Sequence, residues 1–506
     1  MKYNRREFIK LSGMAAIGTA MIPSFLHSCI SGTTPESAVA AMNHFNVSAE
    51  DLKKVILTAL EKGGEYADLY FEHSISNTVG LRDGKVNTAS SDIDFGVGVR
   101  VVTGEQTGYA YTEEITLDEM LKAAKVAARI ASDNARTPSL KVSTREFENY
   151  YPVKTSWEDV SIQQKAPFLQ RLNDRIFELD SRVTKATISL SDKSSVIMFY
   201  NSENTFYHDY RPMVTLSATC IMEQNGEIEN SRVSRSFTMG YEFLTEDIIE
   251  EMAQEVVSKT AILFGAVKPK GGEMPVVMGT GGSGILLHEA IGHSFEADSN
   301  RKNTSIFSDK LGEKICLDSI NVVDTGIIPH NRGSVNIDDE GNVGQKTYIV
   351  KDGILNSYLH DRMSAKHYGV APTGNGRRES FRFAPIPRMR ATYMEEGNIS
   401  EDDMIAEVKY GVYCDVFTNG EVQTGSGDFT FFVKSGSLIE NGKKTTPIKD
   451  INIIGNGPKA LADIVMVSNN LIIDNGSWRC GKQGQSCPVT CGMPSALVSK
   501  LTVGGK

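Results

Sequence analysis

The sequence predicts an α+β protein in which an N-terminal half of helices and sheet precedes a β-rich C-terminal half. Strand signals in the first half come in consecutive runs between helices, which does not fit a simple alternation of β and α units. Short strands dominate the rest, and the aperiodic run VKPKGG at 267–272 is typical of a domain boundary. We therefore divide the chain into a targeting segment and spacer (1–40), an N-terminal α+β region (41–270) and a β-rich C-terminal domain (271–506).

The targeting segment is typical of twin-arginine export. Arg5 and Arg6 stand ahead of a weakly apolar, Gly- and Ala-rich stretch that is too short for a comfortable membrane span. We expect an exported protein, periplasmic or lipid-anchored at the cell envelope. Cleavage has two candidate positions, a lipoprotein site that would leave Cys29 acylated and the small-residue run AVAA at 38–41. Because the second lies far from the apolar core, we favour the lipid anchor.

The helices of the N-terminal half have recognisable starts. Ser48 is a good N-cap with Asp51 three residues on, and the apolar spacing lasts until Gly63 and Gly64. Further helices are predicted at 116–135, around 161–179 and at 245–266.

Strands fill the segments between these helices. In DFGVGVRVVTG at 94–104, apolar residues alternate with Asp, Gly and Arg, which is the period of a half-buried strand. Asp83-Gly84 predicts a turn, and another run of strands extends from about 183 to 240. In the C-terminal domain, Asp352-Gly353 marks the tip of a hairpin, and two helices are conspicuous, at 283–298 and near 400–409.

The composition excludes one class of partner. The formal net charge of the 506 residues is −10, and a protein this acidic is a poor candidate for binding nucleic acid, which requires Lys and Arg on phosphates. Three of the seven cysteines crowd into RCGKQGQSCPVTC near the C-terminus, which is too local to be chance burial.

The stretch GTGGSGILLHEAIGHSFEAD at 279–298 allows two interpretations. Gly279, Gly281 and Gly284 have G-x-G-x-x-G spacing after an apolar run, which suggests an exported nucleotide-binding oxidoreductase. That fold needs a second parallel strand ending in an acidic residue about 20 positions on, whereas the next credible strand ends at Asp324, about twice too far. The glycines are better explained as a tight approach to a helix that Ser283 would cap.

The second interpretation is a metal site. Zinc proteases commonly use H-E-x-x-H on a helix, but here His288 and His293 are five residues apart, about 140° around an α-helix. Both imidazoles can reach one ion only if the helix widens or ends, and Gly292 permits this. Spacing alone leaves a simple polar patch on an amphipathic helix as an equal alternative, and His330, His360, His367, Glu296 and Cys414 are all open as further ligands.

Several stretches together resemble the TldD/PmbA family of metallopeptidases, in its TldD type. They are LLHEAIGHSFEAD and WRCGKQGQSCPV, with FGVGVRV, TGNGRRESF, PIPRMRATYM, ADIVMVSNN and the terminal LTVGG, and they span the chain from about residue 50 onward. The resemblance implies Zn²⁺ bound by His288, His293 and Cys480, with Glu289 as the general base. Three protein ligands leave a fourth position for water.

The resemblance also implies how the enzyme works. Family members hydrolyse unfolded or extended peptides and act as dimers, so we expect a homodimer or a heterodimer with a PmbA-like subunit. A non-catalytic scaffold subunit is a further alternative, against which the intact H-E-x-x-x-H and Cys480 argue.

This chain departs from the family in its export signal and in Cys487 and Cys491, which stand where apolar residues are expected. They could pair with each other, join the metal or be buried thiols, and we favour a Cys487–Cys491 pair or two free thiols, with Cys480 protected by zinc. Glu296 and Asp298 follow the second histidine and are equally consistent with outer-shell partners of the imidazole and with solvated acids. For Arg377 and Arg378 we expect exposed loop charges rather than a grip on substrate.

Overall fold

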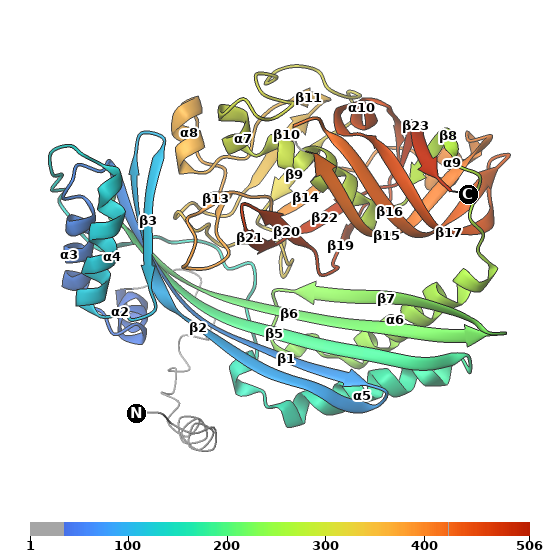
Figure 1. Cartoon of the computed structure of the whole chain (residues 1–506), viewed down its shortest axis with the longest axis horizontal. Helices are drawn as coiled ribbons and strands as arrows, with labels where there is room; N and C mark the ends of the chain where they lie inside the picture. Colours follow the sequence, from blue (N-terminus) through green and yellow to red (C-terminus); the bar gives the residue numbers. More distant parts are fainter. Residues whose placement is uncertain (1–34, 424, 506) are drawn as a thin grey trace.

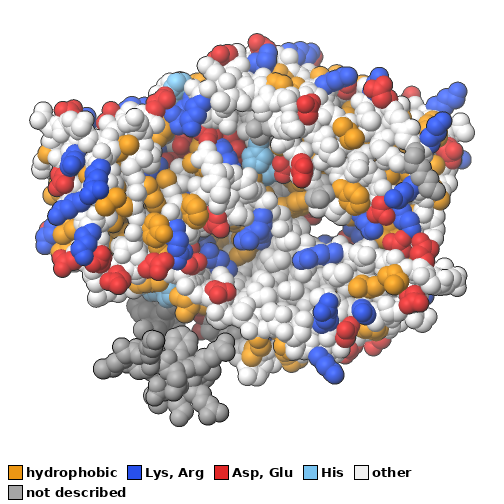
Figure 2. All heavy atoms as spheres, in the orientation of Figure 1, with side chains coloured by type: hydrophobic (Ala, Val, Ile, Leu, Met, Phe, Trp, Pro, Cys, Tyr) orange, Lys and Arg blue, Asp and Glu red, His pale blue; other side chains and the backbone are white. Residues whose placement is uncertain are grey.

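The computed structural model describes residues 35–423 and 425–505 and has the predicted α+β architecture. The first half forms one long curved sheet with helices on its outer face, and a strand-rich body lies against the other side of that sheet (Figure 1). In the space-filling view, the molecule is hollowed between the long sheet and this body, and acidic and basic side chains are mixed over the face (Figure 2).

The predicted export signal and Cys29 lie outside the described residues. The other candidate cleavage run, 38–41, lies within helix α2 (Pro35–His44), where Ala38 and Ala41 are buried. Among the described residues, no helix is long and apolar enough to cross a membrane.

The N-terminal sheet has seven strands in the order β3-β2-β1-β5-β6-β4, with β7 also paired to β6. The strands are β1 (Tyr66–Arg82), β2 (Lys85–Thr103), β3 (Gln106–Thr112), β4 (Ser143–Thr144), β5 (Val183–Asn201), β6 (Thr205–Gln224) and β7 (Glu227–Phe237). The predicted Asp83-Gly84 turn joins β1 to β2, with φ angles of 49° and 72° that suit a tight hairpin. Neighbouring long strands pair antiparallel over nearly their whole length, which gives the sheet its length in Figure 1.

Two pairs of helices cover this sheet, each over its own apolar core. Helices α3 (Ala49–Ala59) and α4 (Leu117–Ala127) pack on one end, and α5 (Ile162–Leu179) and α6 (Glu246–Ala261) pack on the other. The predicted capping box at Ser48 and Asp51 is present, and Thr116 and Thr245 cap α4 and α6. Short 3-10 turns lie at Ala128–Ile130, Trp157–Asp159, Tyr241–Phe243 and Ile262–Gly265.

The C-terminal body contains two six-stranded sheets and two small hairpins around one large core. The first sheet has the order β11-β10-β9-β14-β22-β19 and the second β17-β16-β15-β8-β23-β18. Their strands are β8 (Gly272–Met278), β9 (Val322–Thr325), β10 (Lys346–Lys351), β11 (Ile354–Leu355), β14 (Ala391–Met394), β15 (Tyr410–Gln423), β16 (Asp428–Glu440), β17 (Lys443–Asn456), β18 (Ile464–Val467), β19 (Ile472–Asp474), β22 (Thr490–Met493) and β23 (Ala496–Gly504). The hairpins pair β12 (Gly376–Arg377) with β13 (Ile386–Pro387) and β20 (Arg479–Lys482) with β21 (Gln485–Pro488).

The helices of this body differ in part from the prediction. The helix near 400–409 is α9 (Glu401–Ala406), but the segment at 283–298 is not one α-helix. It is a succession of short helical turns that ends in α7 (Ala297–Arg301). Two further short helices were not predicted, α8 (Arg362–Tyr368) and α10 (Gly457–Ala462).

Buried charges join the two halves. Arg100 of β2 donates to Asp68 of β1 at 2.7 Å and to Glu340 of the C-terminal body at 2.6 Å. The side chains of all three are at most 2% exposed. Removing one partner of such a buried ion pair leaves an uncompensated charge, so this contact fixes how the body sits on the sheet.

Candidate metal centre

A tight glycine-rich turn leads the chain from β8 into the site. Gly281 has a φ of +81°, which favours glycine, and the 3-10 turn Gly282–Gly284 follows. A Cβ on Gly284 would lie 2.5 Å from the backbone nitrogen of Gly492 in β22, so this close approach also needs glycine. Ser283 was predicted to cap the following helix, but it does not. Its buried hydroxyl makes no hydrogen bond within the described chain.

The sheet topology gives no support to the nucleotide-binding alternative. After this turn the next strand, β9, belongs to the other six-stranded sheet and does not pair with β8. A parallel βαβ unit, which a dinucleotide cradle requires, is therefore absent at this glycine turn.

The segment Leu286–Gly292 is a π-helix, and His293 begins a 3-10 turn directly after it. Hydrogen bonds from residue i to i+5 bring residues five apart nearly into line, so the predicted local widening of the helix is confirmed. The imidazole rings of His288 and His293 lie 5.2 Å apart between centroids.

Gly292 matters for a different reason than predicted. Its backbone is ordinary helix, with φ −59° and ψ −48°, so the freedom of glycine to adopt unusual angles is not used. A Cβ at this position would lie 2.3 Å from the sulfur of Met389. Any larger residue would force a shift of Met389, which packs directly against the helix.

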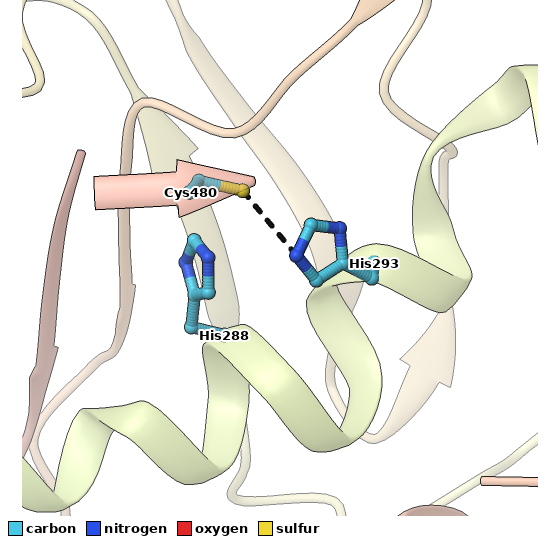
Figure 3. A group of neighbouring side chains, drawn as sticks. All are labelled: His288, His293 and Cys480. Carbon is cyan, nitrogen blue, oxygen red and sulfur yellow. Dashed lines mark hydrogen bonds between the residues drawn. The ribbon is translucent and has the colours of Figure 1, made fainter. Parts of the chain in front are cut away.

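The third group of the site, Cys480, comes from the hairpin of β20 and β21. Its Sγ lies 3.3 Å from Nε2 of His293, and the three ligand atoms lie within 4.8 Å of one another. The side chains point toward one another from the π-helical region and from β20 (Figure 3). His288, His293 and Cys480 are 3%, 9% and 1% exposed.

None of the other residues that the sequence left open as ligands joins the three ligand atoms among the described residues. Among the described residues, His288, His293 and Cys480 are the one group of three or more His, Cys, Asp and Glu side chains whose ligand atoms meet in this way. His330 contacts the carbonyl of Thr238, and His367 pairs with Glu105.

The electrostatics of the three groups favour a thiolate beside imidazoles. Burial opposes ionisation of the Cys480 thiol, but His288 and His293 hold its pKa well below the ordinary value. Burial alone would lower the pKa of His293, whereas Glu296 and Cys480 raise it well above the ordinary range. The two imidazoles and the thiolate therefore form a mutually stabilising charged group in the protein alone.

This donor set fits a zinc ion. Neither ring nitrogen of His288 makes a hydrogen bond of normal length and angle within the described chain, although both are buried and Cys480 lies nearby. Buried polar atoms without a partner are costly, and a metal ion bound there would satisfy one of them. A thiolate and two imidazoles are ligands that zinc prefers, and three protein ligands leave one position open.

Glu289 lies next to the ligands and is less buried than they are. It follows His288 in the π-helix and is half-buried. Burial lowers the pKa of the His288 imidazole, but Cys480 and, to a smaller extent, Glu289 raise it above the ordinary value. A half-buried carboxylate this close to a proposed ligand is suited to exchange protons with a substrate or water.

Glu296 is an outer-shell partner of the site, one of the two alternatives left open by the sequence. Its Oε2 atom accepts a hydrogen bond from Nδ1 of His293 at 2.9 Å and lies 3.0 Å from Nζ of Lys482. Burial would raise the pKa of Glu296, but Lys482 and His293 lower it to about 2. Asp298 does not reach the imidazole and instead accepts from Lys482 at 2.6 Å.

Arginines that were expected to be exposed are buried. Arg377 donates to the carbonyl oxygens of Met389 and Pro488, at 2.6 and 2.8 Å. Arg378 is also buried and donates to the carbonyl of Asp339, at the contact between the two halves. These side chains therefore support the structure and do not reach out to solvent.

Two residues with roles at the site were not anticipated. Arg388 donates to the carbonyls of Cys480 and Gln485, and Arg332 donates to the carbonyl of Trp478. Together with Arg377, they hold the hairpin that carries Cys480 by its backbone. A single arginine in a sequence does not indicate that its side chain will bind a distant backbone carbonyl. The one available signal is that Arg388, like Lys482, lies in a stretch that carries the family resemblance.

Models of three domains of one family match the chain. They are described as PmbA/TldA metallopeptidase domain 1 (residues 67–131), central domain (155–264) and C-terminal domain (271–505). The third contains all three candidate ligands and Glu289.

Curated relatives agree over most of the chain. A "Metalloprotease TldD homolog" of Haemophilus influenzae is 38% identical over 468 residues, which cover 91% of this chain and 97% of the relative. A "Zinc metalloprotease TldD homolog" of Saccharolobus solfataricus is 29% identical over 456 residues, covering 89% and 99%.

Solved structures show the same fold at low sequence identity. A putative modulator of DNA gyrase from Thermotoga maritima aligns with a TM-score of 0.72 at 21% identity, covering 90% of this chain and 100% of that one. TldE from Thermococcus kodakarensis aligns with a TM-score of 0.70 at 18% identity, covering 90% and 100%.

Proposed function

Because the chain belongs to the PmbA/TldD family of metallopeptidases, we propose that it is a zinc-dependent peptidase in which His288, His293 and Cys480 hold the metal. The observation that carries this proposal is the meeting of the three ligand atoms within 4.8 Å, at a buried point where neither nitrogen of His288 makes a hydrogen bond of normal length and angle in the described chain. The name of the Saccharolobus solfataricus relative supports zinc as the metal.

The side chains divide the chemistry between them. Zinc bound here would polarise a peptide carbonyl and lower the pKa of a water molecule. The carboxylate of Glu289 takes a proton from the attacking water and returns it to the leaving amine. Glu296 accepts from Nδ1 of His293, which fixes the imidazole so that Nε2 faces Cys480.

We propose flexible or unfolded peptides as substrates. The ligands are at most 9% exposed, which favours a single extended chain over a folded protein surface as the substrate. Recognition through the peptide backbone places little demand on substrate side chains. Cleavage of a flexible peptide but not of the same sequence inside a folded domain would agree with this substrate class, and equal cleavage of both would contradict it.

The decisive test of the chemistry is Glu289→Gln. The substitution keeps the size of the side chain and removes its ability to take a proton. We expect the variant to bind zinc as the wild type does and to lose most of its peptidase activity, by at least the roughly 10²–10⁴-fold that general acid–base groups contribute. Wild-type cleavage by a zinc-loaded Glu289→Gln protein would exclude Glu289 as the base.

The cellular setting is also a proposal. The twin-arginine pattern supports export to the periplasm or the cell envelope, with Cys29 as the acylated residue. Fatty-acid labelling that is lost in Cys29→Ala would agree with a lipid anchor, and unlabelled protein in the soluble fraction would contradict it.

For the assembly, we propose a homodimer or a heterodimer with a PmbA-like subunit. Its support is the family membership alone. Sedimentation of the purified protein distinguishes a homodimer from a monomer, and an inactive monomer that gains activity with a PmbA-like subunit would indicate the heterodimer.

A further inference from the structure

Cys487 lies directly opposite the candidate zinc ligand Cys480. The two residues are register partners across the β20–β21 hairpin, whose tight turn is formed by Gln483 and Gly484 with φ angles of 49° and 74°. Both cysteines are 1% exposed, whereas Gly481 between Cys480 and the turn faces solvent. Since side chains alternate along a strand, the two sulfurs lie on the same, buried face of the hairpin.

This arrangement suits a disulfide bond. Directly opposed residues in antiparallel strands have Cα atoms about 4.5–5.5 Å apart. Disulfides join Cα atoms roughly 4.4–6.8 Å apart, so the spacing of directly opposed residues falls within the range that a disulfide requires. Both cysteines are free thiols in the structure.

Cys491 does not share this position. It lies on β22, in a different sheet, where its register partners are Thr392 and Asp474. Of the two possibilities raised by the sequence, free thiols rather than a Cys487–Cys491 disulfide are found. Cys487 is therefore the cysteine placed to react with Cys480.

Arg388 holds the two cysteines in this relation. Its guanidinium donates to the carbonyl of Cys480 and lies 3.5 Å from Sγ of Cys487. It also donates to the carbonyl of Gln485 on the second strand, so one buried side chain ties both strands of the hairpin together. The opposed sulfurs are consequently kept side by side and cannot drift apart with a flexible loop.

We propose that Cys480 and Cys487 form a redox pair, in which peroxide converts the metal ligand into a disulfide and releases the metal. The thiolate of Cys480 attacks one oxygen of hydrogen peroxide, giving a sulfenic acid and hydroxide, which a proton converts to water. The Cys487 thiol then attacks that sulfur, the S–S bond forms, and the sulfenic oxygen leaves with the thiol proton as a second water. The two sulfurs lose two electrons and the peroxide gains them.

The consequence for the enzyme is loss of one ligand of three. This part rests on the metal centre proposed above, whereas formation of the disulfide does not. A thiol reductant reverses the reaction and restores the thiolate. Without Cys487, the sulfenic acid at Cys480 has no partner and can be oxidised further to the irreversible sulfinic acid.

Peptide mapping tests the pairing directly, because trypsin separates the two residues. Cleavage after Arg479 and Lys482 leaves Cys480 alone on the peptide 480–482, while Cys487 and Cys491 share the peptide 483–500. The full chain is treated with hydrogen peroxide with and without prior chelation, its free thiols are alkylated, and it is digested without reductant. We expect a linked species of 480–482 with 483–500 in the wild type.

Two variants identify the partner. The linked species should persist in Cys491→Ser and disappear in Cys487→Ser. Its absence from the wild type, or its persistence in Cys487→Ser, would overturn the proposal.

Zinc release and recovery test the consequence. Peroxide should release zinc and abolish peptidase activity in the wild type and in Cys491→Ser, and dithiothreitol with added zinc should restore both. In Cys487→Ser the loss of activity should not be reversible, and full recovery there would contradict the role of Cys487. If the purified protein holds no zinc, the proposed function fails, while the peptide map of the chelated protein still decides whether the disulfide forms.

Discussion

The hydrogen bond between Glu296 and His293 predicts a specific loss of zinc affinity when it is weakened. Both side chains are buried, the bond measures 2.9 Å, and it joins a carboxylate to a ring nitrogen of a proposed ligand. Hydrogen bonds to charged groups contribute about 1.5–3 kcal/mol. Since 1.4 kcal/mol is a factor of ten, removing the bond should weaken zinc binding roughly tenfold to a hundredfold.

Asp298 supplies a matched control for this measurement. It accepts from the same Lys482 as Glu296 does, but it does not contact the imidazole. Glu296→Gln keeps a hydrogen-bond acceptor and should weaken zinc binding about tenfold. Glu296→Ala removes the acceptor and should weaken it about a hundredfold, whereas Asp298→Asn should change zinc affinity by less than about twofold.

The assay is competition for zinc against a chromogenic chelator, with urea unfolding of each metal-free variant to separate affinity from stability. Stability should fall in Glu296→Ala and Asp298→Asn alike, because each leaves Lys482 with one carboxylate. Unchanged zinc affinity in Glu296→Ala, or equal losses in Glu296→Ala and Asp298→Asn, would refute the assignment of Glu296 as the residue that orients His293.

Three further predictions concern single residues. Gly292→Ala should lower the free energy of unfolding by about 1–3 kcal/mol, because the new Cβ would lie 2.3 Å from Met389 Sδ. In a Met389→Ala background the same substitution should cost less. If the two substitutions have additive effects in urea unfolding, the contact does not account for the cost. Burial lowers the pKa of His360 to about 4, so above pH 6.5 the group is neutral in both states, and as the pH falls from 6.5 towards 4 the unfolded chain takes up a proton first. Lowering the pH from 7 to 5 should therefore cost about 2 kcal/mol of stability through His360. In His360→Leu, urea unfolding at the two pH values should show a pH dependence smaller by that amount. A pH dependence equal to that of the wild type would contradict the lowered pKa of His360. Arg388→Lys should weaken the hydrogen bonds to the Cys480 hairpin and lower zinc affinity. Arg390→Lys disturbs a buried ion pair with Asp324 and should lower stability without lowering zinc affinity. Equal loss of zinc affinity in the two variants, measured by chelator competition, would contradict the role given to Arg388.

Local signals in the sequence predicted much of the N-terminal fold. The capping box at Ser48 and the Asp83-Gly84 turn depend on residues within a few positions of each other, so they are visible in the sequence itself. The full length of β1 was not visible. Its polar middle has no strand pattern of its own and is held by partners far along the chain, such as Asp192, which accepts a hydrogen bond from the Asn77 amide at 2.9 Å.

The metal centre shows the same division between local and distant information. The five-residue spacing of His288 and His293 correctly required a break in the α-helix, because helix geometry is local. Cys480, 187 residues from His293, could be identified only through the family resemblance. The reason given for Gly292 was wrong, since its contact with Met389 forms only when the chain has folded.

The sequence does not indicate which charged side chains outside the long strands and helices are buried. Arg378 was expected to be exposed, yet its guanidinium packs 4.3 Å from the ring centroid of Tyr70 and donates to Asp339. Both contacts arise where the C-terminal body meets the N-terminal sheet. No residue near Arg378 in the sequence indicates that this surface is covered.

The zinc content of the purified protein tests the central claim most directly. The account predicts about one zinc per chain in the wild type and in Cys414→Ser, and loss of most of that zinc in Cys480→Ser, because one thiolate of the three-ligand set is removed. Cys414 is a buried cysteine outside the site, so it controls for the general effect of removing a thiol. Zinc retained in full by Cys480→Ser, or a wild-type protein that binds no metal, would contradict the proposed centre.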